Sequence, residues 1–386
     1  MYINRHIENQ IAHAINNYPV TAVTGPRQCG KSTLAKQIMQ NIPSSIYLDL
    51  ERPSDFQKIE NAEWYFSTQK NNLICIDEIQ RKPDLFPLIR SLTDEWGGAG
   101  HFLILGSASQ DLIKQSSESL AGRIVYKNLT PFLWTEIDSL YKIEHYLERG
   151  GFPQSILRTD TDISVEWREN FISTFLERDL LQWANFSSQT MRRLWQMLAH
   201  LNGQTVNYSL IASSLGVSSQ TIKNYIDLLN GTFMIEVVLP YISNSGKRLV
   251  KAPKIYISDS GITAALLGLR NFDEMSGHPV FGFIWEQIVL SNLKGWYRNA
   301  EFFYYRTASG AEIDFVMRFR NRIIAIECKA SFVPSLSKGN YNAIEDIAPD
   351  HTLIVTPATK SWSMKKGIDV VSLKNLEDII AQKCIQ

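Results

Sequence analysis

Residues 25–32 read Gly-Pro-Arg-Gln-Cys-Gly-Lys-Ser, and this stretch decides the fold of the first part of the chain. It matches G-x-x-x-x-G-K-[ST], follows the apolar run Val20–Thr24 and precedes Lys31–Met39, which has helical spacing. Backbone N–H groups of such a loop wrap a phosphate, and the helix start adds partial positive charge. The pattern therefore predicts a phosphate-binding loop between a strand and a helix, against the alternative of an ordinary glycine-rich turn.

Within this loop the residue types predict ATP and Mg²⁺ as ligands. Lys31 is expected to neutralise the β- and γ-phosphates, and the Ser32 hydroxyl to coordinate Mg²⁺. Lys31 is therefore also a predicted catalytic residue. The residues predicted to bind the nucleotide here are Gly25, Pro26, Arg27, Gln28, Cys29, Gly30, Lys31, Ser32 and Thr33.

A second acidic motif, Leu73-Ile-Cys-Ile-Asp77-Glu78, ends an apolar strand with two carboxylates. In open α/β sheets ligands lie at the carboxyl ends of the strands. Asp77 is expected to hold Mg²⁺ through water, and Glu78 to orient the attacking water as a catalytic residue. Acids at strand ends also serve solubility, but the preceding phosphate loop favours the functional interpretation.

Two further residues are candidates for the same site. Ser107 follows the apolar run Phe102–Leu105 and is predicted to sense the γ-phosphate, although a turn serine is as good an interpretation. Arg123 is predicted to stabilise transition-state charge, in cis or across a subunit boundary, with a solvated surface arginine as the alternative.

The first part of the chain alternates apolar runs with helical stretches, which predicts a parallel sheet of about five strands. Helices are expected on both faces of this sheet, including Ser54–Gln69 and Asp84–Glu95. The predicted fold class of the chain is α/β.

The middle of the chain is predicted to be helical and to contain a winged helix-turn-helix. Tyr208–Leu215 and Thr221–Leu229 form the helix pair, and strands follow at Phe233–Pro240 and Lys254–Ser258. The second helix is expected to present Ser219, Gln220, Lys223 and Asn224 to DNA, helped by a basic patch of Lys247, Arg248, Lys251 and Lys254. A module that only packs or contacts protein is the alternative.

The last part of the chain predicts a metal-dependent nuclease-like site. Asp314 and Glu327 end apolar strands, and Lys329 shares a strand face with Glu327. With Glu286 these acids are predicted to hold Mg²⁺ or Mn²⁺, while Glu327 and Lys329 act in catalysis on a phosphodiester. A surface ion pair on an exposed strand is the alternative.

Taken in order, these motifs resemble a prokaryotic family that joins an AAA-type P-loop ATPase domain to a carboxyl-terminal domain of unknown function. The resemblance rests on GPRQCGKST, ICIDEIQ, LILGSAS, SLAGRI, GGFPQ, FLERDL, KAPKIYISDSGI, RTASGAEIDFV and IECKAS. It implies an AAA-type sheet and a last domain similar to the PD-(D/E)xK restriction-endonuclease fold, with Ile313 where proline is usual. The expected domains are residues 1–142, 143–270 and 271–386.

Composition limits the partners. Lys+Arg and Asp+Glu both total 39 in 386 residues, so nucleic-acid or membrane binding requires a local patch. The four cysteines form no CxxC pair, and no apolar run reaches membrane-spanning length, so a cytoplasmic protein without membrane contact is expected.

Three functions follow as hypotheses. In the first, ATP hydrolysis controls a DNA-cleaving or DNA-binding terminal domain. In the second, the chain is an ATP-dependent regulatory or defence switch whose terminal domain only binds a partner. In the third it is a homo-oligomeric motor in which Arg123 completes a neighbour's site.

Overall fold

The structure is a computed structural model that describes residues 2–107, 119–180, 187–242 and 249–384. The chain forms two compact units, Met1–Phe132 with Gly231–Phe233, and Leu133–Asn230 with Met234–Gln386. The Ser107 side chain and the basic residues Lys247 and Arg248 lie outside what the structure describes. The expected three-domain division stays a prediction.

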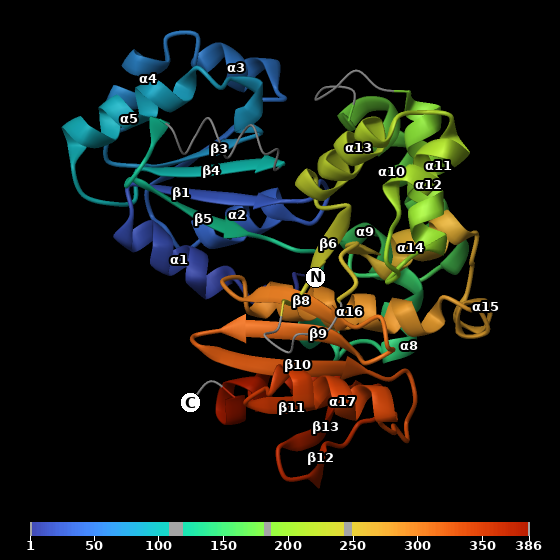
Figure 1. Cartoon of the computed structure of the whole chain (residues 1–386). Coiled ribbons are helices and arrows are strands. Elements are labelled where there is room, and N and C mark those ends of the chain that lie inside the picture. Colours follow the sequence, from blue (N-terminus) through green and yellow to red (C-terminus); the bar gives the residue numbers. More distant parts are fainter. Residues whose placement is uncertain (1, 108–118, 181–186, 243–248, 385–386) are drawn as a thin grey trace. The chain divides into compact units, whose positions relative to one another are not determined.

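The first unit contains a five-stranded parallel sheet in the order β2-β3-β4-β1-β5 (Figure 1). Because all strands run the same way, their carboxyl ends meet at one edge. The predicted α/β class is therefore confirmed for this unit. The strands are β1 (Val20–Gly25), β2 (Ser45–Asp49), β3 (Leu73–Asp77), β4 (Phe102–Ser107) and β5 (Ile124–Asn128).

Apolar side chains on both faces of this sheet are buried in two separate cores. The expected single helix over Ser54–Gln69 is wrong, because the chain forms two helices there. Asn61 starts the second one by accepting a hydrogen bond from the Trp64 N–H at 3.2 Å. The helices of this unit are α1 (Glu8–Asn17), α2 (Lys31–Met39), α3 (Pro53–Lys58), α4 (Ala62–Thr68), η1 (Ile79–Arg81) and α5 (Leu85–Trp96).

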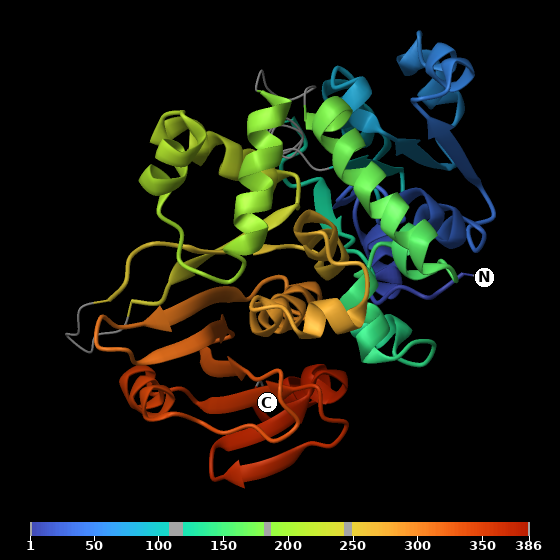
Figure 2. The same cartoon turned by 90° about the vertical axis from the view of Figure 1, so that its right-hand side faces the viewer.

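The second unit is built on an eight-stranded mixed sheet in the order β12-β13-β11-β10-β9-β8-β6-β7. Figures 1 and 2 show its later strands, coloured orange to red, lying together. The strands are β6 (Ile235–Pro240), β7 (Lys254–Ile257), β8 (Glu301–Arg306), β9 (Glu312–Phe319), β10 (Arg322–Cys328), β11 (His351–Thr356), β12 (Trp362–Lys365) and β13 (Ile368–Ser372).

The helices between residues 161 and 267 of the second unit share an aromatic and aliphatic core around the fully buried Trp195. Among the described residues, none of the helices combines the length and the apolar character needed to cross a membrane. They are α7 (Trp134–Ile137), α8 (Ile143–Arg149), α9 (Pro153–Ile156), α10 (Thr161–Thr174), η2 (Phe175–Asp179), α11 (Ser188–His200), α12 (Tyr208–Leu215), α13 (Ser219–Gly231), α14 (Ser260–Leu267), α15 (Phe272–Ser276), α16 (Phe281–Trp296), α17 (Lys338–Ile347), η4 (Leu373–Asn375), α18 (Leu376–Ile379) and η5 (Ile380–Cys384).

Candidate functional site

The predicted phosphate loop connects the end of β1 to the start of α2 in the first unit. Gly25 has a φ of 154°, and a Cβ on it would collide with the carbonyl oxygen of Leu129, so this position needs glycine. The side chain of Cys29 is buried, and its thiol donates to the same oxygen at 3.5 Å. The loop is therefore packed tightly against the chain that follows β5.

Lys31 is buried, and its side chain folds back over this loop. Its Nζ donates to the carbonyl oxygens of Gly25 at 3.1 Å and Pro26 at 2.9 Å. Both acceptors are neutral carbonyl groups, so neither hydrogen bond places a counter-charge beside the ammonium group. A concentrated positive charge beside helix N–H groups is what a phosphate chain requires, and these residues fit the predicted nucleotide.

Arg5 supports the loop from behind and was not predicted from the sequence. Its Nη1 donates to the Cys29 carbonyl oxygen at 3.0 Å, and its Nη2 to that of Thr130 at 2.7 Å. The guanidinium also lies over the Phe132 ring at 4.5 Å. No motif marks Arg5, because its partners are backbone atoms 24 and 125 residues away.

Tyr47, on β2, links the two predicted Mg²⁺ ligands. Tyr47 and Cys75 are register partners, and the Tyr47 hydroxyl donates a short hydrogen bond to Asp77 Oδ2. Burial raises the pKa of Tyr47, the contact with Asp77 raises it further, and a hydrogen bond with Ser32 opposes the rise. The phenol is thus a neutral donor between Ser32 and Asp77, whose oxygens suit Mg²⁺.

Glu78 follows Asp77 in the left-handed backbone region, with φ 58°. Its N–H donates to Asp77 Oδ1 at 3.0 Å, and the Gln80 side chain donates a short hydrogen bond to its carboxylate. Burial raises the pKa of Glu78, although the charge of Lys31 opposes the rise. A carboxylate made more basic by burial is suited to orienting and polarising water.

Ser107 and Arg123 lie at opposite ends of the parallel strands. The Ser107 backbone is the register partner of Gly25, at the loop edge. Arg123 comes just before β5, and its carbonyl accepts from the Val20 N–H at the start of β1. Its guanidinium pairs with Asp94 at 2.5 and 2.9 Å. The prediction that Arg123 binds the nucleotide in cis is therefore wrong. Arg123 lies beside the amino end of β1, whereas the phosphate loop follows the carboxyl end of the same strand.

In the second unit the structure brings together Glu327 and Lys329, as predicted from their shared strand face. Lys329 Nζ lies 2.6 Å from Glu327 Oε1, and Asn340 donates to the same oxygen at 3.0 Å. Burial raises the pKa of Glu327 to about 8, and the neighbouring charge of Asp314 adds to the rise. Asp314 itself accepts from the Cys328 N–H at 2.8 Å.

Glu286, Asp314 and Glu327 do not form the predicted metal site. Among the described residues there is no group of three or more His, Cys, Asp or Glu side chains that could hold a metal ion. Lys254 Nζ instead lies 3.9 Å from both Glu286 and Asp314. This chain's own ammonium group stands beside the acids where a cation was expected, so the residues present do not fit Mg²⁺ or Mn²⁺.

Lys254 was expected in an exposed basic patch, and that expectation is also wrong. Its side chain is 2% exposed, whereas Lys251 is exposed. In α13, Ser219, Gln220, Lys223 and Asn224 are exposed, as an external contact would require. No periodicity marks Lys254 as internal, because burial of a lysine depends on acids far away in the sequence.

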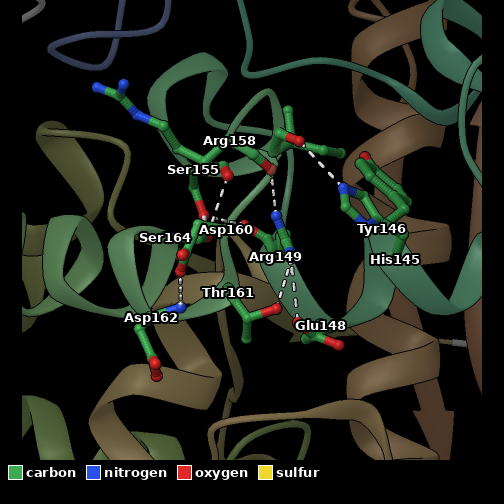
Figure 3. Close-up of polar contacts among 12 residues, drawn as sticks. His145, Tyr146, Glu148, Arg149, Ser155, Arg158, Asp160, Thr161, Asp162 and Ser164 are labelled. Carbon is green, nitrogen blue, oxygen red and sulfur yellow. Dashed lines mark hydrogen bonds and ion pairs between the residues drawn. The ribbon is translucent and has the colours of Figure 1, made fainter.

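A buried polar network surrounds the GGFPQ motif at residues 150–154, and no role was predicted for it (Figure 3). Arg149 donates to the Arg158 carbonyl oxygen and, at 2.7 Å, to Thr161 Oγ1. Ser155 Oγ donates to the Arg149 carbonyl oxygen at 2.7 Å and lies 3.0 Å from Ser164 Oγ. These contacts connect α8, α9 and α10, so we assign the network a structural role.

Comparison with known families agrees with the site in the first unit. Residues 17–138 match an AAA domain, residues 140–273 a domain of unknown function (DUF8612), and residues 281–376 a domain of unknown function (DUF4143). The Walker-type ATPase PABY2304 of Pyrococcus abyssi is similar at 16% identity and a TM-score of 0.47, over 69% of this chain and 96% of that one.

Two relatives have no assigned function. An uncharacterized Haemophilus influenzae protein is 25% identical over 285 residues, covering 65% of this chain and 70% of that protein. The uncharacterized protein Rv2008c of Mycobacterium tuberculosis is 37% identical over 363 residues, covering 94% of this chain and 82% of that protein. This chain therefore belongs to the family of Rv2008c, and its residues 17–138 are a P-loop ATPase domain of the AAA type.

Proposed function

We propose that this protein is an ATP-dependent molecular switch, in which ATP binding and hydrolysis in the first unit control partner binding by the second. The observation that carries the proposal is the Lys31 ammonium, held over the phosphate loop by the Gly25 and Pro26 carbonyl oxygens. The AAA-domain match over residues 17–138 supports the same chemistry.

The proposed hydrolysis uses four side chains. Lys31 binds the β- and γ-phosphates, while Ser32 and Asp77 would hold Mg²⁺, which neutralises phosphate charge when bound. Glu78 orients water for attack on the γ-phosphorus, and ADP departs as the bond to the bridging oxygen breaks. The raised pKa of Glu78 supports this role, because a more basic carboxylate polarises water better.

Calorimetry and a phosphate-release assay test the ATPase. The wild-type chain should bind ATP in the presence of Mg²⁺, Lys31→Ala should lose binding, and Glu78→Gln should bind ATP but hydrolyse it at least about 100-fold more slowly. Gln40→Ala serves as a control, since Gln40 is exposed at the far end of the same helix. Hydrolysis retained by Lys31→Ala would contradict the proposed site.

For the partner we propose duplex DNA, contacted by α13 in a winged helix-turn-helix. The support is the set of four exposed polar residues at the start of α13, with Lys223 adding positive charge. Lys223→Ala should weaken binding to a labelled duplex about 10-fold, measured by fluorescence anisotropy with and without ATP. Ser213→Ala, exposed on α12, should change nothing. Equal binding by all three proteins would argue for a protein partner.

A second candidate function is DNA cleavage by a restriction-endonuclease-like domain over residues 271–386. It is favoured by the contact of Lys329 with Glu327 and by Glu327 Oε2, which is buried and has no hydrogen-bond partner among the residues that the structure describes. Cleavage of plasmid DNA with Mg²⁺ or Mn²⁺ that is lost in Asp314→Ala would support it, and would contradict the conclusion that Glu286, Asp314 and Glu327 form no metal site. Intact DNA under both ions would leave the switch proposal standing.

A homo-oligomer in which Arg123 acts across a subunit boundary is tested by loss of turnover in Arg123→Ala.

A further inference from the structure

Four charged side chains of the second unit form what we call the Lys254 cluster: Lys254, Glu286, Glu312 and Asp314. Lys254 Nζ lies 3.0 Å from Glu312 Oε1 and 3.9 Å from both Glu286 Oε2 and Asp314 Oδ1. One ammonium group therefore faces three carboxylates that come from a helix and a strand.

The remaining contacts of these carboxylates are also supplied by the protein. Tyr256 donates to Glu286 Oε2 at 2.7 Å, and the Cys328 N–H donates to Asp314 Oδ2 at 2.8 Å. Arg306 Nε lies 3.6 Å from Glu312 Oε2. Mg²⁺ requires oxygen ligands at about 2.0–2.1 Å in near-octahedral geometry. Glu286 accepts from a tyrosine, Asp314 accepts from the backbone, and Glu312 lies 3.0 Å from the ammonium group, so these carboxylates are poorly placed to meet that requirement.

The backbone fixes Lys254 in this position. Lys254 is the register partner of Val238 on β6 and bridges to Thr205 on its other side. Its neighbours in the chain are held as well, because Val206 N–H donates to the Pro253 carbonyl oxygen at 2.9 Å. The Lys254 side chain also lies 5.5 Å from the centre of the Tyr304 ring. The strand contacts therefore fix the backbone from which the buried Lys254 side chain reaches the acids.

We infer that Lys254 is a built-in counter-cation that takes the place of a divalent metal among Glu286, Glu312 and Asp314. The cluster then joins β7 to α16 and β9 as an internal ion group, and the wild-type protein has no metal centre at these residues. This inference goes beyond the switch proposal and does not require the first unit to hydrolyse ATP.

Charge balance gives a test without activity. Lys254→Met should lower the unfolding temperature of the complete chain by roughly 5 to 10 °C, because it leaves buried carboxylates uncompensated. Glu286→Gln should lower the unfolding temperature of the wild type but raise that of Lys254→Met, since it then removes an unpaired charge. Lys329→Met is the matched control, and Glu286→Gln should not raise its unfolding temperature. Loss of stability on adding Glu286→Gln to Lys254→Met would overturn the inference.

Mn²⁺ binding is the second measurement, made by calorimetry without nucleotide. We expect Asp314→Asn to leave any Mn²⁺ binding of the wild type unchanged. Wild-type binding of Mn²⁺ that Asp314→Asn abolishes would overturn the inference, even if Lys254→Met failed to fold. The same result would leave the ATPase site untouched, because Lys31→Ala tests that site separately.

Discussion

The hydroxyl of Tyr47 is a single group with two neighbours that the sequence places far apart. It donates to Asp77 on the adjacent strand and interacts with Ser32 at the start of α2. A neutral donor in this position, together with the Glu78 N–H that donates to Asp77 Oδ1 at 3.0 Å, fixes the orientation of the acid. Groups that hold ligating carboxylates in this way commonly alter metal affinity when removed.

Tyr47→Phe should therefore impair the ATPase without unfolding the protein. We expect the Mg²⁺ concentration needed for half-maximal hydrolysis to rise about 10-fold, with a smaller effect on ATP binding measured without metal. Tyr18→Phe is the control, because Tyr18 is exposed in the same unit. An unchanged Mg²⁺ dependence in Tyr47→Phe would show that the hydroxyl does not position Asp77.

The sequence predicts the residues of the nucleotide site whose spacing is local. Lys31, Ser32 and Asp77 stand out because a loop motif and a strand end mark them. Tyr47 and Arg5 do not, since each works through contacts made only when distant strands or backbone carbonyls meet. The position of Lys254 could not be predicted for the same reason. In the sequence it belongs to a group of basic residues, and only the folded chain brings it close to three acids.

At the level of elements, the turn after α8 depends on a close approach to the start of α14. Gly150 has a φ of 71°, and Asp259 accepts from the Gly151 N–H at 2.7 Å while capping α14. A Cβ on Gly150 would collide with the Asp259 carboxylate. This arrangement joins two helices through one acid.

Gly150→Ala should destabilise the second unit by more than about 2 kcal/mol, measured by urea unfolding, because it combines backbone strain with displacement of a buried acid. The matched control is Gly268→Ala. Gly268 has a φ of 73°, and no atom of the described part of the chain lies within 4 Å of an added Cβ, so only the backbone strain of about 1 kcal/mol applies. Equal losses for the two variants would contradict the argument.

Asp350 pins the starts of β10 and β11, and it predicts a pH dependence. Its carboxylate accepts from the Ile323 N–H and from Arg322, both at 2.8 Å, and these donors lower the pKa of Asp350. The stabilisation is present above the ordinary aspartate pKa of about 3.9 and is lost as the pH falls through the lower folded value. Asp350→Asn should cost about 1 kcal/mol at neutral pH. Urea unfolding at several pH values should show the difference shrinking below about pH 4; a constant difference would contradict it.

The same scale shows which elements sequence patterns predict. Strand β3 and helices α2 and α12 begin and end where expected, because apolar runs stop there at charged or turn residues. The expectation that Asp314 ends a strand is wrong, because Asp314 lies near the start of β9. Strand β13 was not predicted, because its five residues are identified as a strand by pairing with β11 and β12. The break between α3 and α4 was missed because the Asn61 cap interrupts an otherwise continuous helical pattern.

For the whole molecule, ATP binding predicts a selective gain in stability. A ligand at 100 times its dissociation constant stabilises the state that binds it by about 2.7 kcal/mol. Scanning calorimetry of the complete chain with ATP and Mg²⁺ should therefore show one transition raised by roughly 10 °C. Lys31→Ala should remove this shift while keeping the transitions of the nucleotide-free protein. A shift that persists in Lys31→Ala would place the nucleotide elsewhere.

Arg5, near the amino end of the first unit, stabilises the phosphate loop through contacts with residues far from it in the sequence. The guanidinium lies over the ring of Phe132, the last residue of the continuous segment that forms this unit. It also donates a hydrogen bond to the Cys29 carbonyl oxygen. Shortened versions of the protein that start at β1 would keep every motif residue yet lose this fastening. Their phosphate loop would lose the hydrogen bond from Arg5 to the Cys29 carbonyl oxygen. Removing the amino-terminal residues should therefore weaken nucleotide affinity without altering a single residue that faces the nucleotide.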